Sequence, residues 1–208
     1  VACSARAGAV MAPCPDCGLH HQCICPALPH IDSAVRLALL THDNEFERAT
    51  NTGHWLAKSL PHCHRYRWSR VTPPADLLRL MSCGDVTPYL VFPATHSVSA
   101  GQAWHNGQRL GKAALFIVLD GTWQEARKML RKSPWLQTLP QVHLSPAEDS
   151  AYRLRRNQET GHLCTLEVGC ELLTAAEEYA SATALRAFLR VSMDAYQADK
   201  SGHALQRE

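Results

Sequence analysis

Four cysteines near the start of the chain have the spacing of a metal site. Cys14 and Cys17 are separated by two residues, and Cys23 and Cys25 by one. Four thiolates complete the tetrahedral shell that Zn²⁺ prefers, and a two-residue gap lets one turn supply two ligands. A closed shell of this kind leaves no coordination position for a substrate, so we predict a structural zinc ion.

Other interpretations of these cysteines remain open. His20 or His21 could replace one thiolate, and Cys14 with Cys17 could form the reversible disulfide of a thiol oxidoreductase. A redox pair normally sits where a strand meets a helix, whereas this pair lies in a proline-rich segment. The chain contains nine cysteines, an odd number that argues against a closed disulfide framework and favours metal binding in a reducing cytoplasm.

A second group of chemically useful residues follows the most apolar stretch of the chain, residues 113–119. Asp120 comes directly after it, and then Gly121, Thr122 and Trp123. Ligands of open α/β sheets bind at the carboxyl ends of strands, so this carboxylate is placed to orient or deprotonate a substrate. Gly121 lets a ligand approach the backbone, Thr122 can cap the next helix, and Trp123 offers an aromatic face. The alternative is that Asp120 merely caps a helix and Trp123 packs in the core.

A helix start beside an arginine is a third candidate site. Asn51 and Thr52 are good helix caps, Gly53 follows them, and Arg48 precedes Asn51 by three residues. The N–H groups of a helix N-terminus and a guanidinium both bind carboxylates or phosphates. The alternative is that Asn51 and Thr52 only form the turn.

Two basic segments are candidates for contacting the phosphates of a nucleic acid. In a helix over residues 123–132, the cationic side chains fall opposite an apolar stripe. A charge run is more often a solvated face, and that alternative stays open. The residues concerned are Arg127, Lys128, Arg131 and Lys132 in the helix, and Arg153, Arg155 and Arg156 further along.

The elements that must position these residues alternate between strands and helices, which indicates an α/β sheet. Apolar runs predict strands at 35–41, 88–93, 113–119 and 141–144. Helices are predicted around the turn at 51–53 and over 123–132. A capping-box pattern of Thr174 and Glu177 predicts the start of a C-terminal helix that reaches about Tyr196.

Composition and charge exclude several classes of protein. The chain has 208 residues, of which 46% are apolar and 19% charged, so it can bury a core and is not intrinsically disordered. No apolar run approaches the ~18 residues of a transmembrane helix. A net charge of +2 excludes a histone-like wrapper but permits a bounded basic face. Motifs for Walker-type nucleotide hydrolysis, dinucleotide binding, serine hydrolases and zincin proteases are missing from the sequence.

The predicted division of the chain is one domain with a small appendage. Residues 1–12 form a ragged N-terminus without the pattern of a signal peptide, and residues 13–32 form the zinc-binding knuckle. Residues 33–200 form the α/β catalytic domain with its C-terminal helix, and residues 201–208 a frayed tail. We expect a cytoplasmic protein that is not bound to a membrane, as either a monomer or a homodimer.

Taken in order, these segments resemble the DTW-domain proteins, which are tRNA-uridine aminocarboxypropyltransferases. The resemblance runs from about residue 14 to residue 190. Four short motifs carry it, and their joint order makes it specific. They are CxxC…CxC at Cys14, Cys17, Cys23 and Cys25; His-x-x-Glu…Asn-Thr-Gly at His42, Glu45, Asn51, Thr52 and Gly53; Asp-x-Thr-Trp at Asp120, Thr122 and Trp123; and Thr-x-Glu-Ala at Thr165 and Glu167, where Val168 replaces the alanine.

The resemblance implies an activity and a fold. Such proteins transfer the 3-amino-3-carboxypropyl group of S-adenosylmethionine to N3 of a uridine in tRNA, typically at position 47 of the variable loop. Their fold is related to the knotted SPOUT methyltransferases. N3 is a poor nucleophile until it loses its proton, and we expect Asp120 to accept that proton.

The expected site residues fall into three groups besides the zinc ligands. The catalytic group is Asp120, Thr122 and Trp123. The group expected to bind S-adenosylmethionine is Arg48, Asn51, Thr52, Gly53, Pro93, Leu119, Gly121, Thr165 and Glu167. The group expected to bind tRNA is Arg127, Lys128, Arg131, Arg153 and Arg155.

Two competing functions remain besides the thiol oxidoreductase considered for Cys14 and Cys17. A SPOUT-type RNA methyltransferase would use the same donor but transfer the methyl group, which adds far less mass to the nucleoside. A non-catalytic zinc-knuckle RNA-binding module would need the cysteines and the basic surface, but neither Asp120 nor a cofactor pocket.

Overall fold

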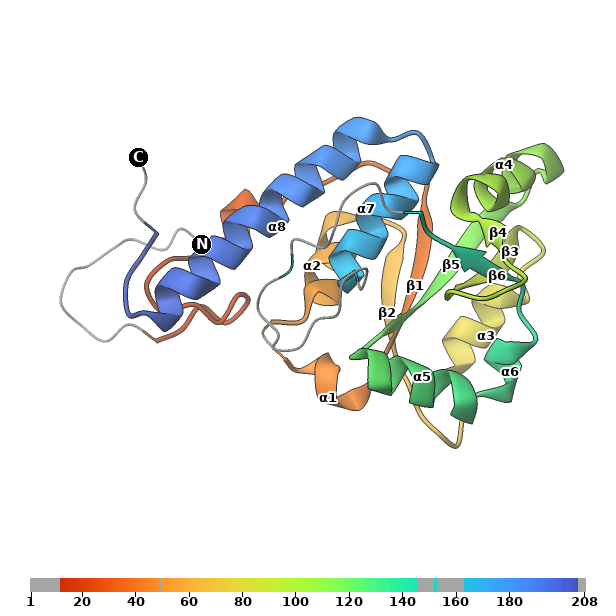
Figure 1. Cartoon of the computed structure of the whole chain (residues 1–208), viewed down its shortest axis with the longest axis horizontal. Coiled ribbons are helices and arrows are strands. Elements are labelled where there is room, and N and C mark those ends of the chain that lie inside the picture. The colour runs from red at the N-terminus through yellow and green to blue at the C-terminus, as the bar shows by residue number, and fades with distance from the viewer. Residues whose placement is uncertain (1–11, 49, 146–151, 153–162, 206–208) are drawn as a thin grey trace.

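The computed structural model describes residues 12–48, 50–145, 152 and 163–205 (Figure 1). Its centre is a six-stranded sheet in the order β2-β1-β5-β3-β6-β4, and the pairings between its strands are parallel. The predicted α/β sheet is therefore confirmed. The strands are β1 (Arg36–Thr41), β2 (Cys63–Arg67), β3 (Val86–Val91), β4 (Val98–Ser99), β5 (Ala113–Asp120) and β6 (Gln141–His143).

Helices cover both faces of this sheet, as Figure 1 shows. One face carries α2 (Thr52–Ser59), α4 (Ala100–Leu110) and α7 (Thr165–Ala175), with α8 (Tyr179–Lys200) packed on α7. The other face carries α3 (Ala75–Met81), α5 (Trp123–Lys132) and α6 (Pro134–Gln137). The short helix α1 (Asp43–Phe46) follows β1, and a 3₁₀ turn, η1 (Cys25–Ala27), closes the cysteine-rich segment.

The central strands β1 and β5 explain why both faces are covered. In β5, Phe116 and Val118 pack towards α2 and α7, while Leu115 and Ile117 pack towards α5. Side chains alternate between the faces of a strand, so a strand that is apolar at every position needs a layer of helices on each side. By the same alternation, the side chain of Asp120 belongs to the α2 and α7 face.

The strongest sequence patterns predicted their elements well. The strands expected at 35–41, 113–119 and 141–144 correspond to β1, β5 and β6, and the helix at 123–132 is α5. Asn51 caps α2, as its position in the turn predicted, because its side chain accepts a hydrogen bond from the backbone N–H of His54.

Two predictions of element ends are wrong. β3 begins at Val86, so Pro88 lies inside the strand instead of at its start; there β3 pairs with β5 alone, because its pairing with β6 begins only at Leu90. A proline is tolerated where one side of a strand has no partner. Thr174 and Glu177 do not start the last helix, because Thr174 lies near the end of α7 and its hydroxyl donates to the Cys170 carbonyl.

The cysteine-rich segment at 13–32 packs against the end of α8 (Figure 1). Asp199 accepts hydrogen bonds from the backbone N–H groups of His20 and His21, both at 2.8 Å. The Tyr196 hydroxyl donates to the Cys17 carbonyl at 2.7 Å. The chain beyond α8, which was expected to be frayed, continues this contact as far as residue 205, since the Leu205 N–H donates to Gln22 at 2.8 Å.

Within the described part of the chain, no helix combines the length and the apolar character needed to cross a membrane.

Candidate active site

Asp120 lies at the carboxyl end of β5, and its carboxylate is enclosed by hydrogen-bond donors. The side chain of Thr165 donates to Oδ1 at 2.6 Å, and that of Thr41 donates to Oδ2 at 2.9 Å. The amide of Asn51 lies 3.1 Å from both oxygens. Asp120 is only 1% exposed, so its charge is balanced by these donors instead of by solvent.

The N-termini of α2 and α7 meet at this carboxylate. Asn51 caps α2, and the Thr52 hydroxyl accepts the Leu166 N–H of α7 at 3.2 Å. A β-carbon on Gly53 would stand 2.8 Å from Asp120 Oδ2, so the helix approaches the carboxylate as closely as a glycine permits. Helix N-termini favour negative charge. Asp120 itself therefore occupies the anion position that the sequence assigned to an external ligand at 51–53.

A second buried carboxylate extends this network. Glu45 is 0% exposed, and its Oε1 accepts a hydrogen bond from Arg48 at 2.6 Å. The Asn51 amide lies 3.4 Å from Glu45 Oε2, so Asn51 bridges Glu45 and Asp120. The Arg48 side chain is 45% exposed, which leaves it facing solvent beside the network.

On the opposite face of β5, Glu125 holds the turn that contains Thr122. Its Oε2 accepts the N–H and the hydroxyl of Thr122 at 2.8 and 2.9 Å, which completes a capping box for α5. Its Oε1 accepts the side-chain amide of Asn44 at 2.9 Å. Burial alone would raise the pKa of Glu125, but the hydrogen bonds from Thr122 and Asn44 and the neighbouring His42 outweigh it and lower this pKa.

His42 joins these two halves of the site. Its backbone N–H donates to the Asp120 carbonyl at 2.9 Å, and its ring stacks on Trp68 with centroids 5.4 Å apart. The Nδ1 atom caps α1 by accepting the Asn44 N–H at 3.3 Å and lies 3.5 Å from Glu125 Oε1.

Two aromatic side chains, Phe92 and Trp123, lie at the ends of the neighbouring strands β3 and β5. Trp123 and Phe92 are partly buried, with ring centroids 6.0 Å apart. Pro93 is exposed just after β3, whereas Leu119 is only 8% exposed and belongs to the core on the α5 face. Glu167 accepts the Cys164 N–H at the start of α7 and thus supports that helix.

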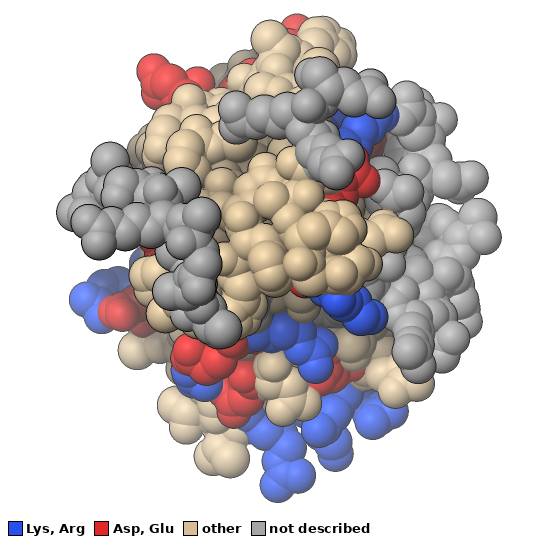
Figure 2. Space-filling view, turned by 90° about the vertical axis from the view of Figure 1, so that its left-hand side faces the viewer, with Lys and Arg blue, Asp and Glu red and all other residues tan. Residues whose placement is uncertain are grey.

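The cationic face predicted for α5 is present. Arg127, Lys128, Arg131 and Lys132 are exposed, while Ala126 and Met129 are buried against the sheet. Figure 2 shows Lys and Arg gathered in the lower part of its face, at the height of α1 and α5, with Asp and Glu between them. Arg153, Arg155 and Arg156 lie outside the described residues.

The four predicted zinc ligands lie together. The Sγ atoms of Cys14, Cys17, Cys23 and Cys25 are within 4.8 Å of one another, with Cys14 at 3.6 Å from Cys23 and 3.7 Å from Cys25. Zinc–sulfur bonds of ~2.3 Å in a tetrahedron separate sulfurs by about 3.8 Å, so this donor set fits zinc. A backbone hydrogen bond from Cys17 lowers the pKa of the Cys14 thiol to about 7, whereas burial raises the pKa of Cys17 and of Cys25. A metal ion would have to displace the protons of those two buried thiols.

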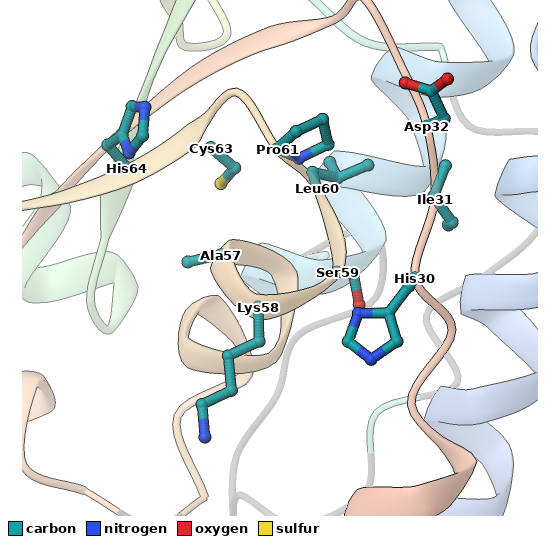
Figure 3. A pocket seen from close by; sticks show the side chains of 10 residues that line it. All are labelled: His30, Ile31, Asp32, Ala57, Lys58, Ser59, Leu60, Pro61, Cys63 and His64. Atoms are coloured by element: carbon teal, nitrogen blue, oxygen red, sulfur yellow. The ribbon is translucent and has the colours of Figure 1, made fainter.

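A separate pocket of about 560 Å³ lies at the other end of α2, beside the edge strand β2 (Figure 3). It contains none of the site residues predicted from the sequence. In Figure 3 the Lys58 side chain extends away from the strand, and Lys58 forms an ion pair with Asp16 of the cysteine-rich segment at 2.6 Å. The pocket is lined by His30, Ile31, Asp32, Ala57, Lys58, Ser59, Leu60, Pro61, Cys63 and His64.

Four members of the site were not identified from the sequence as functional residues: Thr41, His42, Glu45 and Glu125. Thr41 ends an apolar strand and carries no local signal. Glu125 follows Thr122 by three residues, which is the spacing of a capping box and could have identified it. His42 was matched only as part of a motif, because the sequence does not show that its ring meets α5.

Comparison with known proteins places these features in a family. The family model of the DTW domain matches residues 11–197. The chain is 32% identical over 162 residues to tRNA-uridine aminocarboxypropyltransferase 2 of Drosophila melanogaster, covering 74% of this chain and 62% of that protein. It is 24% identical over 172 residues to the Mus musculus protein of the same name, covering 79% of this chain and 57% of that protein. No solved structure matches the chain.

Proposed function

Because the chain belongs to the DTW-domain family, we propose that it transfers the 3-amino-3-carboxypropyl group of S-adenosylmethionine to N3 of a uridine in tRNA. The observation that carries the proposal is the meeting of Asn51, Asp120 and Thr165 at the carboxyl edge of the sheet. Three of the four motif segments supply these residues. The names of the two relatives support the same reaction.

The transfer needs alignment more than activation of the donor. N3 loses its proton and attacks the carbon of the aminocarboxypropyl chain that is bonded to sulfur. The carbon–sulfur bond breaks, and its electron pair stays on the sulfur of methylthioadenosine. Since the sulfonium is already a good leaving group, the protein mainly holds N3, carbon and sulfur in line.

Asp120 is our candidate for accepting the proton from N3, and the structure restricts how it could do so. Both carboxylate oxygens accept hydrogen bonds from Thr41, Thr165 or Asn51. To receive a proton, the carboxylate must give up one of these bonds. Its second role, holding the N-termini of α2 and α7 together, needs no such rearrangement.

The donor is proposed to bind along the same edge. Arg48 is half exposed beside the Glu45–Asn51–Asp120 network, which suits it to hold the donor's carboxylate. Thr52, Gly53, Thr165 and Glu167 lie on the helix side of this edge, and Pro93 and Gly121 on its strand side. Leu119 packs in the core on the α5 face, so only its backbone is available to the donor. Trp123, paired with Phe92, offers a face for a base.

The tRNA backbone is proposed to lie on the cationic face of α5, where Arg127, Lys128 and Arg131 are exposed. We further propose uridine 47 as the acceptor, a knotted SPOUT-like topology, and the cytoplasm as the location. The zinc ion held by Cys14, Cys17, Cys23 and Cys25 would be structural, since four protein ligands close its shell.

One experiment tests the function directly. Unmodified tRNA is incubated with the protein and S-adenosylmethionine, digested to nucleosides and weighed by mass spectrometry. We expect a uridine heavier by the aminocarboxypropyl group. A gain of one methyl group would identify a methyltransferase, and tRNA binding with an unchanged nucleoside would identify a non-catalytic binding module.

A further inference from the structure

Uridine N3 lies between two carbonyl groups, and this places a demand on the site. When N3 loses its proton, the negative charge spreads onto the oxygens at C2 and C4. A fixed hydrogen-bond donor aimed at either oxygen stabilises that charge as it develops. We propose that Nε2–H of His42 is this donor, an inference that rests on the proposed function.

The contacts of Nδ1 determine that Nε2 carries a proton. In the neutral ring, Nδ1 accepts the Asn44 N–H at 3.3 Å, which leaves the hydrogen on Nε2. With Nδ1 in this accepting role, Nε2 is the donor of the ring.

The ring is fixed in place and keeps only a small exposed area. It stacks on Trp68, whose Nε1 donates to Ser133 Oγ at 3.0 Å, so the supporting ring is itself held. His42 is 7% exposed. Among the described residues Nε2 forms no hydrogen bond, and 9% of the side-chain surface remains exposed.

The position of His42 suits a uracil base held at the carboxyl edge of the sheet. Its backbone N–H bonds to the Asp120 carbonyl, while alternation along β1 and β5 puts its ring on the face opposite to the Asp120 carboxylate. Gly121 packs between His42 and Glu125, since a β-carbon there would stand 3.6 Å from that of His42 and 3.1 Å from that of Glu125. The imidazole of His42 and the carboxylate of Asp120 thus lie on opposite faces of the sheet at the same edge.

A second histidine at this edge provides a matched comparison. His143 ends β6, which is separated from β5 by β3, so it lies about 10 Å further along the sheet. Its Nδ1 pairs with Ser97 at 2.9 Å. His143→Asn therefore removes an imidazole from the same edge without touching the proposed donor.

The test is a double-mutant cycle between His42 and the substrate. Wild type and His42→Asn are assayed with tRNAs that carry uridine, 2-thiouridine or 4-thiouridine at the acceptor. Asparagine is chosen because it keeps the cap of α1. With uridine we expect kcat to fall by about 10²-fold in His42→Asn, the usual cost of losing one such donor.

The thio substitutions provide the decisive comparison. Sulfur accepts hydrogen bonds poorly, so the thio substitution at the carbonyl that His42 contacts should reduce kcat. We expect this reduction in wild type and in His143→Asn to be larger than in His42→Asn. Intrinsic changes in the acidity of N3 affect all three proteins equally and cancel. A coupling at C4 would also make His42 the residue that disfavours cytosine, which carries an amino group there.

Equal thio effects in wild type and His42→Asn, or an unchanged kcat in that variant, would overturn the proposal. If His42→Asn does not fold, as judged by circular dichroism, His42→Gln is tested in the same cycle. A wild-type protein that does not modify tRNA would instead remove the proposed function itself.

Discussion

Gly53 and Asp120 approach each other so closely that a β-carbon on Gly53 would lie 2.8 Å from Oδ2 and 3.0 Å from Cγ of the carboxylate. The carboxylate cannot move aside without breaking its hydrogen bonds to Thr41, Asn51 and Thr165. The start of α2 and the end of β5 therefore fit together only with a glycine at residue 53.

We expect Gly53→Ala to lower the free energy of unfolding by about 1–3 kcal/mol, the usual cost of overpacking. Urea denaturation measures the change. Gly84→Ala is the control, because a β-carbon there meets nothing within 4 Å. Equal stability of the two variants would show that the contact between Gly53 and Asp120 relaxes freely.

Asp120→Asn should reduce turnover by about 10²-fold or more if this carboxylate accepts the proton from N3. The affinities for S-adenosylmethionine and tRNA should change little. The free energy of unfolding should also fall by about 1–3 kcal/mol, since an amide cannot satisfy all the donors around it. The kinetics and urea denaturation of Asp120→Asn are compared with those of Asp76→Asn, whose carboxylate is exposed.

Two results would contradict this role for Asp120. Normal turnover in Asp120→Asn would leave the residue a purely structural one. Weak binding of S-adenosylmethionine with normal turnover at saturation would make Asp120 a binding residue, and water or the RNA itself would then take the proton.

The protein should contain one zinc ion per chain, as measured by elemental analysis of material purified without chelator. Cys23→Ser should lose most of this zinc and loosen the contact between the knuckle and α8. Cys83→Ser is the control, because Cys83 is exposed and lies outside the cluster. Full zinc content in Cys23→Ser would mean that another side chain completes the shell.

Binding of tRNA should depend on the cations of α5 and weaken steeply as salt rises. Replacing Arg127 or Arg131 by alanine should flatten the plot of log affinity against log salt by about one unit each. Lys112→Ala, which removes an exposed cation after α4, should leave that slope unchanged. A slope unaltered by the α5 changes would place the RNA on another surface.

Glu125 should make stability depend on pH in the acid range. Its pKa in the folded protein lies below the usual 4.5, so it releases its proton more readily when folded. Its contribution to stability is therefore present above about pH 4.5 and is lost as the pH falls through the folded pKa. The difference in unfolding free energy between wild type and Glu125→Gln should shrink on acidification; a difference independent of pH would contradict this assignment.

Local patterns identified the elements that carry the site but not the contacts within it. Apolar runs identified β1 and β5, and the caps of α2 and α5 were visible from Asn51 and Thr122. The edge strand β2 was missed because its sequence, Cys-His-Arg-Tyr-Arg, has no apolar run. Helix α7 was missed because the capping-box pattern at Thr174 was interpreted as the start of the last helix, whereas Thr174 lies near the end of α7.

The role of Asp120 shows why the rest could not be predicted. Its place at a strand end follows from the sequence, yet its donors come from residues 41, 51 and 165. Only the order of the strands brings these distant segments together, and periodicity carries no information on that order. The sequence therefore indicated an available carboxylate where the structure has one enclosed by donors.

The contact between the knuckle and α8 has a consequence for biosynthesis. Cys17 and Tyr196 are 179 residues apart, so during translation the knuckle emerges long before the helix that holds it. Until α8 is made, the proposed zinc ion would hold the four cysteines together, with the ion pair between Asp16 and Lys58 of α2 as a further contact. We expect a nascent chain without its last thirty residues to bind zinc but to expose Leu19 and Ile24, which α8 and its neighbours cover in the finished protein.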